Sequence, residues 1–447
     1  SYNWIFYLAE AFMGMPFPLN SIIWFANGFY NAQLFALIFL TFTFLKKRTP
    51  ISPLWLLPTI TVAFWSVFPN IFYFNLGNLT TGFLPAVQGI EFTGVFGLDF
   101  MIALVNIVGY TLLKRQFRKE KYNLAMAAIV ISLWFGYGSY SLNEWDERLE
   151  TWTTKKIGIV QPNHPSIDEV LQFEPGFSAQ YPPEMKLSQS LAKNGAEIIV
   201  WPEGAYRGYF HDLSVRLNYN KNVKEMNAAL FFHDYPNDYS QAETIYRNGT
   251  VWIKENGKLG GVYHKRYLVP FGEVLPFFGN NEYIIELFGL PASQTPGDKI
   301  LVAESAGMRL QPLICYETQF SDFVAKSIGR DAKGKVMIVQ SNDGWYGPGN
   351  QPEQHRSSNV LRSVETRLPM VHVINNGKSS ITLPNGRYLF VSERSVRGSW
   401  GIDMPYNRES GGSFYTSYPY LFIGFLRCIT IFFFIFAYIA HRKEQRS

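Results

Sequence analysis

Cysteine is scarce in this chain of 447 residues, which contains only Cys315 and Cys428. Two cysteines cannot build a disulfide framework. Cys428 lies within an apolar run near the C-terminus, whereas Cys315 ends a strand-like segment. We therefore expect the two thiols to lie in different environments and not to pair.

Charge and metal-binding patterns are also sparse. Only 17% of the residues are charged, and the seven histidines show no HExxH or CxxC spacing. The chain has no glycine-rich phosphate loop with suitable flanks and no stripe of basic and aromatic residues. We therefore predict no metal, no cofactor and no nucleic-acid partner.

Apolar residues, by contrast, are abundant and unevenly distributed. They make up 47% of the chain, and 17% of all residues are aromatic, yet the mean hydropathy is only −0.03. This combination indicates apolar spans attached to a more polar domain. Because a span needs about 20 mostly apolar residues, we predict five of them, at residues 21–45, 54–74, 90–113, 124–142 and about 418–440. A sixth stretch, 4–15, is too short to span.

The basic residues of the short loops predict the orientation of these spans. Lys46-Lys47-Arg48, the segment 114–121 and the tail HRKEQRS are basic, whereas residues 75–89 contain no Lys or Arg. Basic loops tend to face the cytoplasm. We therefore expect the region between the last two spans to lie outside the cytoplasm, which in a bacterium means the periplasmic face of the inner membrane. The alternative is a set of unusually long core helices.

Three regions follow from this division. Residues 1–142 are predicted to be N-terminal transmembrane helices, residues 143–417 a periplasmic catalytic domain, and residues 418–447 a last transmembrane helix with a basic cytoplasmic tail. The chain begins with Ser, so spans before residue 1 are possible.

The middle region alternates strand-like and helix-like segments. Strands are predicted at 156–161, 196–200, 308–315, 336–340 and 370–374, and helices at 184–194 and 353–367. A hairpin is expected around Asn256-Gly257, because Asn-Gly favours a tight turn between two strands. Strands that alternate with helices predict an α/β sandwich.

Three polar residues lie at the ends of apolar strands, where side chains are held firmly but remain accessible. They are Glu203, Lys265 and Cys315. A Cys can attack a carbonyl carbon as thiolate, a Glu can move the proton, and a Lys can stabilise the developing oxyanion. From residue types alone, a buried and inert Cys315 remains an alternative.

Several ordered motifs resemble the nitrilase superfamily of carbon–nitrogen hydrolases and, more narrowly, the apolipoprotein N-acyltransferases of bacterial inner membranes. The resemblance extends from about residue 156 to 387. The matching segments are WPEG at 201–204, YHKRYLVPFGE at 263–273, ICYE at 314–317, SNDGWYG at 341–347, QH at 354–355, RSVE at 362–365 and NNGKS at 375–379.

The resemblance implies a role for each matching position. Cys315 would be the nucleophile, Glu203 the general base and Lys265 the oxyanion partner. Glu273 would hold the lysine and assist catalysis, while Tyr316 and Glu317 would shape the pocket of the nucleophile. Trp201 and Trp345 would bind substrate. Structural hydrogen bonding remains the alternative for Glu273 and Glu317, as does simple packing for Trp345.

The resemblance also implies a fold and a reaction. The fold would be a polytopic α-helical membrane domain joined to a nitrilase-like αββα sandwich. The enzyme would move a fatty acyl chain from a phospholipid, through a Cys thioester, to the N-terminal amine of a diacylated lipoprotein, and it would act as a monomer among membrane lipids. The aromatic loops 206–210 and 275–278 would form an apolar mouth at the bilayer.

The membrane region resembles the family less closely. The family has eight spans, and residues 54–75 contain no EWLR-like stretch. A membrane-bound amidase, or an acyltransferase with another amine acceptor, therefore remains an alternative. A non-enzymatic membrane scaffold is a further one, although the complete Glu, Lys and Cys set argues against it.

Overall fold

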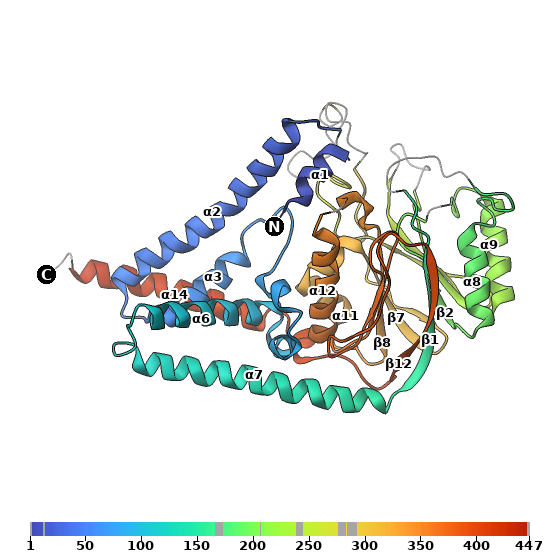
Figure 1. Cartoon of the computed structure of the whole chain (residues 1–447). Coiled ribbons are helices and arrows are strands. Elements are labelled where there is room, and N and C mark those ends of the chain that lie inside the picture. Colours follow the sequence, from blue (N-terminus) through green and yellow to red (C-terminus); the bar gives the residue numbers. More distant parts are fainter. Residues whose placement is uncertain are drawn as a thin grey trace.

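The structure is a computed structural model that describes residues 2–11, 14–165, 173–205, 207–237, 245–275, 283, 293–347 and 349–444. Long helices extend to one side, and two stacked sheets with their flanking helices form the other side (Figure 1). We call the two-sheet unit, with its flanking helices, the sandwich.

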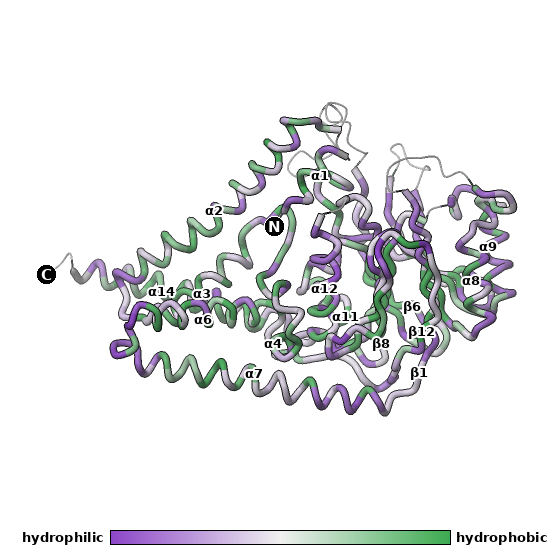
Figure 2. Tube along the Cα trace, in the orientation of Figure 1, coloured by the Kyte–Doolittle hydropathy of each residue, from purple (hydrophilic) through white to green (hydrophobic). Residues whose placement is uncertain are grey.

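Four helices of the described residues are long and apolar enough to cross a membrane. They are α2 (Leu19–Arg48), α6 (Val95–Leu113), α7 (Lys121–Glu150) and α14 (Leu421–Glu444). Large apolar side chains on their outer surfaces are exposed, among them Phe25 and Leu40, and the helices are mostly hydrophobic along their lengths (Figure 2). Such surfaces are suited to lipid rather than to water.

The structure corrects the prediction of a second span at residues 54–74. The structure has α3 (Pro53–Trp65) there, a helix of 13 residues, which is about 20 Å long at 1.5 Å per residue and so shorter than the hydrocarbon core of a bilayer. Arg427 of α14 donates to the hydroxyl and the carbonyl oxygen of Ser66, at 3.0 and 2.9 Å. This contact satisfies the helix end, which would otherwise leave carbonyl groups unpaired.

The other expected spans shift at their ends. Residues 90–113 divide into a short turn, α5 (Ile90–Thr93), and α6, while α7 continues eight residues beyond the predicted end of its span. In the described part of the segment 4–15, the structure has the helix α1 (Trp4–Ala11). Two further short elements, η1 (Leu76–Thr80) and α4 (Leu84–Val87), lie between α3 and α5.

The sandwich contains two six-stranded sheets. The first has the order β12 (Gly398–Tyr406), β1 (Thr153–Gln161), β2 (Ile198–Val200), β3 (Ala229–Asp234), β4 (Gly249–Ile253) and β5 (Leu259–His264). The second has the order β11 (Tyr388–Val391), β10 (Ser380–Thr382), β9 (Met370–Ile374), β8 (Lys335–Ser341), β7 (Met308–Ile314) and β6 (Ala303–Ser305).

Apolar side chains of the two sheets meet in one core, where Ile157 and Val200 of the first sheet pack with Leu310 and Ile338 of the second. Helices α8 (Pro183–Lys193) and α9 (Leu213–Met226) cover the outer face of the first sheet. Helices α11 (Ser321–Ile328) and α12 (Gln351–Thr366) lie on the side of the second sheet that faces the membrane helices (Figure 1). The predicted fold class, a helical membrane region with a nitrilase-like αββα sandwich, is confirmed.

A buried seam joins the two regions. Apolar residues of α12, including Val360 and Val364, pack against Val87 and Ile90 of the membrane region. Arg367, which is 1% exposed at the end of α12, forms an ion pair with Glu91 and also donates to Gln88 and Ser141. Loss of these partners would leave a buried, unpaired charge and strongly destabilise the folded state. The seam therefore fixes the sandwich against the helices.

The two basic loops lie together at the end of the helices that is remote from the sandwich, and the C-terminus lies at the same end (Figure 1). Ser52 donates to Glu120 at 2.8 Å, and Trp55 donates to Asn123 at 3.1 Å, so these contacts connect the loops. The predicted division at residues 142 and 417 stays a prediction. Helix α7 continues through the first of these positions, and the sheets lie between Thr153 and Tyr406.

Candidate active site

A cluster of buried charges lies where the strands of the first sheet end. Glu203 follows β2 by three residues, Lys265 follows β5 directly, and Glu273 lies in the loop beyond it. The Lys265 ammonium is 3.3 Å from Oε1 of Glu203 and 2.8 Å from Oε1 of Glu273. The structure thus brings together three of the residues that the sequence analysis selected, and we call them, with Asn248, the charged cluster.

Asn248 is a member that the sequence analysis missed. Its Nδ2 donates to Oε1 of both Glu203 and Glu273, each at 2.9 Å. His233 sets the orientation of this amide. Its Nδ1 accepts from the Gly204 amide at 3.3 Å, so its Nε2 carries the proton and donates to Oδ1 of Asn248 at 2.9 Å. Nothing in the spacing of residues 233 and 248 indicates this arrangement, because it exists only once β3 and β4 pair.

The charges of the cluster depend on one another. Burial works against the ionised form of Glu203, but Lys265 and the donated hydrogen bonds lower the pKa of this carboxyl overall. Burial likewise opposes the charge of Lys265, yet the two carboxylates raise the pKa of the ammonium well above its ordinary value. Burial and the neighbouring Glu203 raise the pKa of Glu273. Of the two carboxyl groups, Glu203 is therefore the one that is held ionised.

Cys315 comes from the second sheet. It directly follows β7 and begins the short helix η2 (Cys315–Gln319), with a φ of +49°. The left-handed region costs a residue with a side chain on the order of 1–3 kcal/mol and often marks a functional position. Burial and the Glu203 carboxylate raise the pKa of the thiol well above its usual range, although Lys265 opposes this. A thiol that is held protonated needs a base before it can react as a nucleophile.

Glu317 connects the two sheets beside Cys315. Its Oε1 accepts from the Tyr263 hydroxyl at 2.8 Å and from the Arg266 amide at 2.7 Å, and its Oε2 accepts from the Ile314 amide at 2.8 Å. The amides belong to residues adjacent to Lys265 and Cys315. Glu317 therefore holds the lysine segment and the cysteine segment at a set separation.

A second buried network supports the backbone of Cys315. His355 of α12 places Nδ1 2.9 Å from an Asp343 carboxylate oxygen and Nε2 3.1 Å from the Cys315 carbonyl oxygen. Both of these atoms accept hydrogen bonds, so the ring carries both protons. Burial opposes this charge, but Asp343 raises the pKa of His355 overall. The SNDGWYG and QH motifs contain both residues, although neither had been given a role.

Tyr316 turns away from the charged cluster, toward the membrane region. Its hydroxyl donates to the Ile71 carbonyl at 3.1 Å and accepts from the Tyr73 amide at 3.4 Å. The residue after the cysteine thus contacts the segment between α3 and η1.

The two predicted substrate-binding tryptophans lie in different surroundings. Trp345, in η3 (Asp343–Tyr346), is partly buried against Trp4 and Ile5 of α1. Trp201 is 0% exposed, packs against Tyr219 and Phe232, and donates to Ser188 at 2.8 Å. A ring that is enclosed in this way has no open face, so a contact between Trp201 and substrate stays a prediction without support from its placement.

The predicted apolar mouth falls partly outside the described residues, since residues 206 and 276–278 are not among them. Of the remainder, Tyr209 is buried in the core beneath α9. Among the residues that the structure describes, no three or more His, Cys, Asp or Glu side chains are grouped so that they could hold a metal.

Comparison with known proteins shows the family of this chain. Residues 156–398 match the carbon-nitrogen hydrolase family. The apolipoprotein N-acyltransferase of Rickettsia bellii is 27% identical over 68% of this chain and 59% of its own length. The apolipoprotein N-acyltransferase 2 of Leptospira interrogans is 23% identical over 100% of this chain and 87% of its own. A solved amidase from Nesterenkonia sp. AN1 is 16% identical, with a TM-score of 0.41, over 56% of this chain and 93% of its own. The chain spans about three fifths of the length of several relatives that it matches, 59% for the Rickettsia bellii protein.

Proposed function

We propose that this chain, which belongs to the carbon–nitrogen hydrolase family, transfers a fatty acyl group from a phospholipid, through a thioester on Cys315, to the N-terminal amine of a diacylated lipoprotein. One observation carries the proposal. The charges of the buried Glu203 and Lys265 pair reach the buried Cys315 thiol, and the next residue, Tyr316, contacts the membrane region.

The membrane helices favour a lipid substrate. An enzyme that acts on soluble amides needs no membrane spans. An enzyme whose acyl donor is anchored in a bilayer must reach the surface of that bilayer. The contact of Tyr316 with Ile71 and Tyr73 supports such a route, since these residues follow α3 in the membrane region and lie against the sandwich. The names of the relatives support the same substrate class.

In the first half-reaction, Glu203 takes the thiol proton of Cys315 as the sulfur attacks the ester carbonyl carbon of the phospholipid. The Lys265 ammonium stabilises the oxyanion, which is the usual contribution of a fixed cation at that position. The tetrahedral state collapses with loss of the lipid alkoxide, which receives the proton from Glu203. The products are the Cys315 thioester and a lysophospholipid.

In the second half-reaction, the lipoprotein amine attacks the thioester carbonyl carbon and Glu203 accepts a proton from its nitrogen. The Cys315 thiolate leaves and is reprotonated, and an amide bond has formed. Water would compete with the amine, so exclusion of water decides whether the chain transfers or hydrolyses.

The position of the basic loops supports an orientation in the inner membrane. These loops and the C-terminus lie at the end remote from the sandwich, and basic loops favour the cytoplasm. The sandwich then faces the periplasm. We expect a monomer, because helices on both sides of the sandwich restrict its assembly with other copies.

The chain provides a matched control for the test, since Cys428 is its other cysteine and is exposed. Full-length protein is incubated with phospholipid and no acceptor, and intact-mass spectrometry then measures acyl adducts. The parent and Cys428→Ser are expected to gain one hydroxylamine-sensitive acyl group, whereas Cys315→Ser gains none. A diacylated lipopeptide added next should remove the acyl group and acquire it.

Two results would contradict the proposal. An acyl group that forms equally on Cys315→Ser would exclude the thioester. Release of ammonia from amides, without acyl transfer to the lipopeptide, would instead support a membrane-bound amidase.

A further inference from the structure

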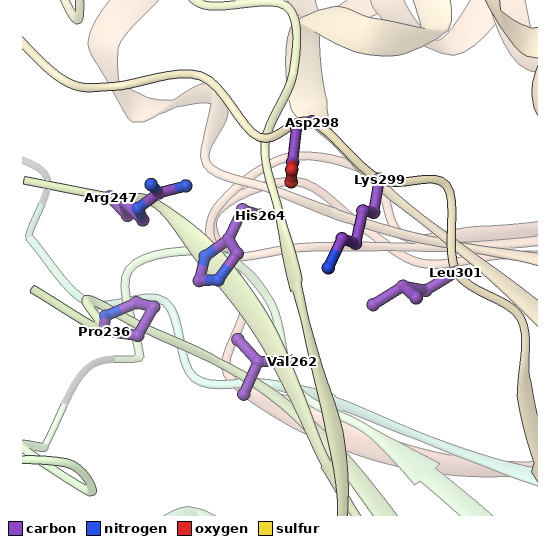
Figure 3. A pocket seen from close by; sticks show the side chains of 7 residues that line it. All are labelled: Pro236, Arg247, Val262, His264, Asp298, Lys299 and Leu301. Carbon is purple, nitrogen blue, oxygen red and sulfur yellow. The ribbon is translucent and has the colours of Figure 1, made fainter.

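A cavity of about 560 Å³ lies beside the ends of β4 and β5 (Figure 3). It is lined by Pro236, Arg247, Val262, His264, Asp298, Lys299 and Leu301. Its volume is within the range of small-molecule sites. None of the catalytic residues proposed above lines it, so the cavity is separate from the charged cluster.

Neighbouring positions in the chain nevertheless place the cavity beside that cluster. Arg247 and His264 line the cavity, while the next residues, Asn248 and Lys265, belong to the charged cluster. The cavity and the charged cluster are therefore formed by adjacent residues of the same two backbone segments.

The cavity has a net positive charge. Arg247 and Lys299 approach from opposite sides, with the His264 ring between them (Figure 3), and Asp298 is the acidic residue of the lining. Within the described parts of the chain, the side chains of Arg247 and Lys299 form no ion pair or hydrogen bond. Burial and the charge of Arg247 lower the pKa of His264, which keeps its ring neutral at pH 7.

The remaining lining indicates more than a simple ion. Nδ1 of His264 is buried and has no hydrogen-bond partner among the described residues, so a hydroxyl group of a ligand could pair with it. Pro236, Val262 and Leu301 add an apolar wall. A phosphate group between the two cations, with a short hydroxyl-bearing carbon chain against this wall, matches Arg247, Lys299, the His264 nitrogen and the apolar side chains.

We infer that this cavity binds a small organic phosphate of the glycerophosphate type, either free or as the headgroup of a lipid. The inference goes beyond the proposed acyl transfer and holds whichever acceptor the enzyme uses.

The bound phosphate would also act on the charged cluster through the backbone. The Lys265 amide donates to the Asn248 carbonyl at 2.8 Å, and the Gly297 amide donates to the Lys265 carbonyl at 2.8 Å. A ligand held by Arg247, His264 and Lys299 joins the three segments that make these two hydrogen bonds. It should therefore slow their opening, and with it the exchange of the amide hydrogens.

The test uses full-length protein in detergent with glycerol 3-phosphate or inorganic phosphate, followed by calorimetry and by hydrogen exchange over residues 246–266. Lys299→Glu is the variant, because Lys299 is exposed and its replacement is expected to leave the fold intact. Lys258→Glu, an equally exposed lysine at the tip of the β4–β5 hairpin, is the matched control. Lys299→Glu is expected to weaken binding at least tenfold and to abolish the protection from exchange, whereas Lys258→Glu changes neither.

The source of the phosphate is decided by a second arm, in which protein released from phosphatidylglycerol nanodiscs is examined by native mass spectrometry. Binding of the soluble phosphates indicates a free ligand, and a phospholipid retained by the parent but not by Lys299→Glu indicates a headgroup. The inference is overturned if none of these phosphates binds, or if the two lysine variants lose equal affinity.

Discussion

The two sheets hold their halves of the active site by different means. The first sheet supplies charges that stay in place because they compensate one another, with Lys265 between Glu203 and Glu273 and with Asn248 donating to both. The second sheet supplies a thiol that is positioned by its backbone, through the left-handed conformation of Cys315 and the hold of His355 on its carbonyl. The charged half is thus sensitive to any loss of a partner, whereas the cysteine half is sensitive to displacement.

Removal of the proposed base from the charged half should have the largest effect on the rate of acylation. Glu203→Gln keeps the shape of the side chain but removes the proton acceptor, and we expect acyl-Cys315 to form ~1000-fold more slowly, within the range for general base catalysis. Single-turnover acylation followed by intact mass measures the rate. Glu197→Gln, which removes a half-exposed carboxylate paired with Lys155, is the control. A rate close to that of the parent would assign the base to another group.

Asn248→Ala should have the next largest effect, because it removes a donor from both carboxylates. Hydrogen bonds to the ionised form lower a carboxyl pKa, so their loss should raise the pKa of Glu203. Activity requires this carboxylate ionised and is lost as the pH falls, so the acidic limb of the pH–rate profile should move upward by about one unit.

His233→Phe leaves Asn248 in place but removes the donor that orients its amide. We expect a smaller shift of the acidic limb in the same direction. A uniform loss of rate at every pH, with no shift, would show that Asn248 has only a structural role.

Glu317→Gln should change the pH dependence of stability, because Glu317 joins the two halves of the site. Burial raises the pKa of this carboxyl to about 7, so the folded state keeps a proton that the unfolded state releases above its ordinary pKa of 4.5. The parent should therefore lose up to ~1.4 kcal/mol of stability per pH unit between these values. The variant lacks this slope.

Thermal unfolding of the two proteins in detergent at pH 5 and pH 7.5 measures the difference. The melting temperature of the parent should fall more than that of the variant as the pH rises. Parallel changes would mean that Glu317 is ionised throughout this range, a state that the four hydrogen bonds it accepts would also permit.

The smallest effect is expected for Trp201→Phe. The enclosed indole loses only its hydrogen bond to Ser188, so we expect ~1 kcal/mol of destabilisation and a KM for phospholipid within twofold of the parent value. Steady-state kinetics in mixed micelles measures it. A large increase in KM would instead restore the predicted role of Trp201 in binding substrate.

The sequence was most informative where local pattern decides structure. The alternation of strands with helices, together with the hairpin at Asn256-Gly257, predicts the sandwich. Polar residues at the ends of strands predict which side chains lie close together there. The roles of Glu203, Lys265 and Cys315 remain proposals, but the charged cluster contains both the glutamate and the lysine.

The sequence was least informative where a contact links distant residues. Apolar composition predicts a helix over residues 54–74, but α3 ends at Trp65, where Arg427 satisfies its terminal carbonyl from another helix. His233 and Asn248 likewise show no motif, since their hydrogen bond arises only when β3 and β4 pair.

The Tyr316 hydroxyl is hydrogen-bonded to the backbone of Ile71 and Tyr73. These contacts have a practical consequence for the study of catalysis in solution. A polypeptide shortened to start at residue 151 would lack this support next to Cys315. It would also leave the guanidinium of Arg367 stranded without Glu91, Gln88 and Ser141. The chemistry therefore cannot be separated from the lipid-embedded portion by a single cut.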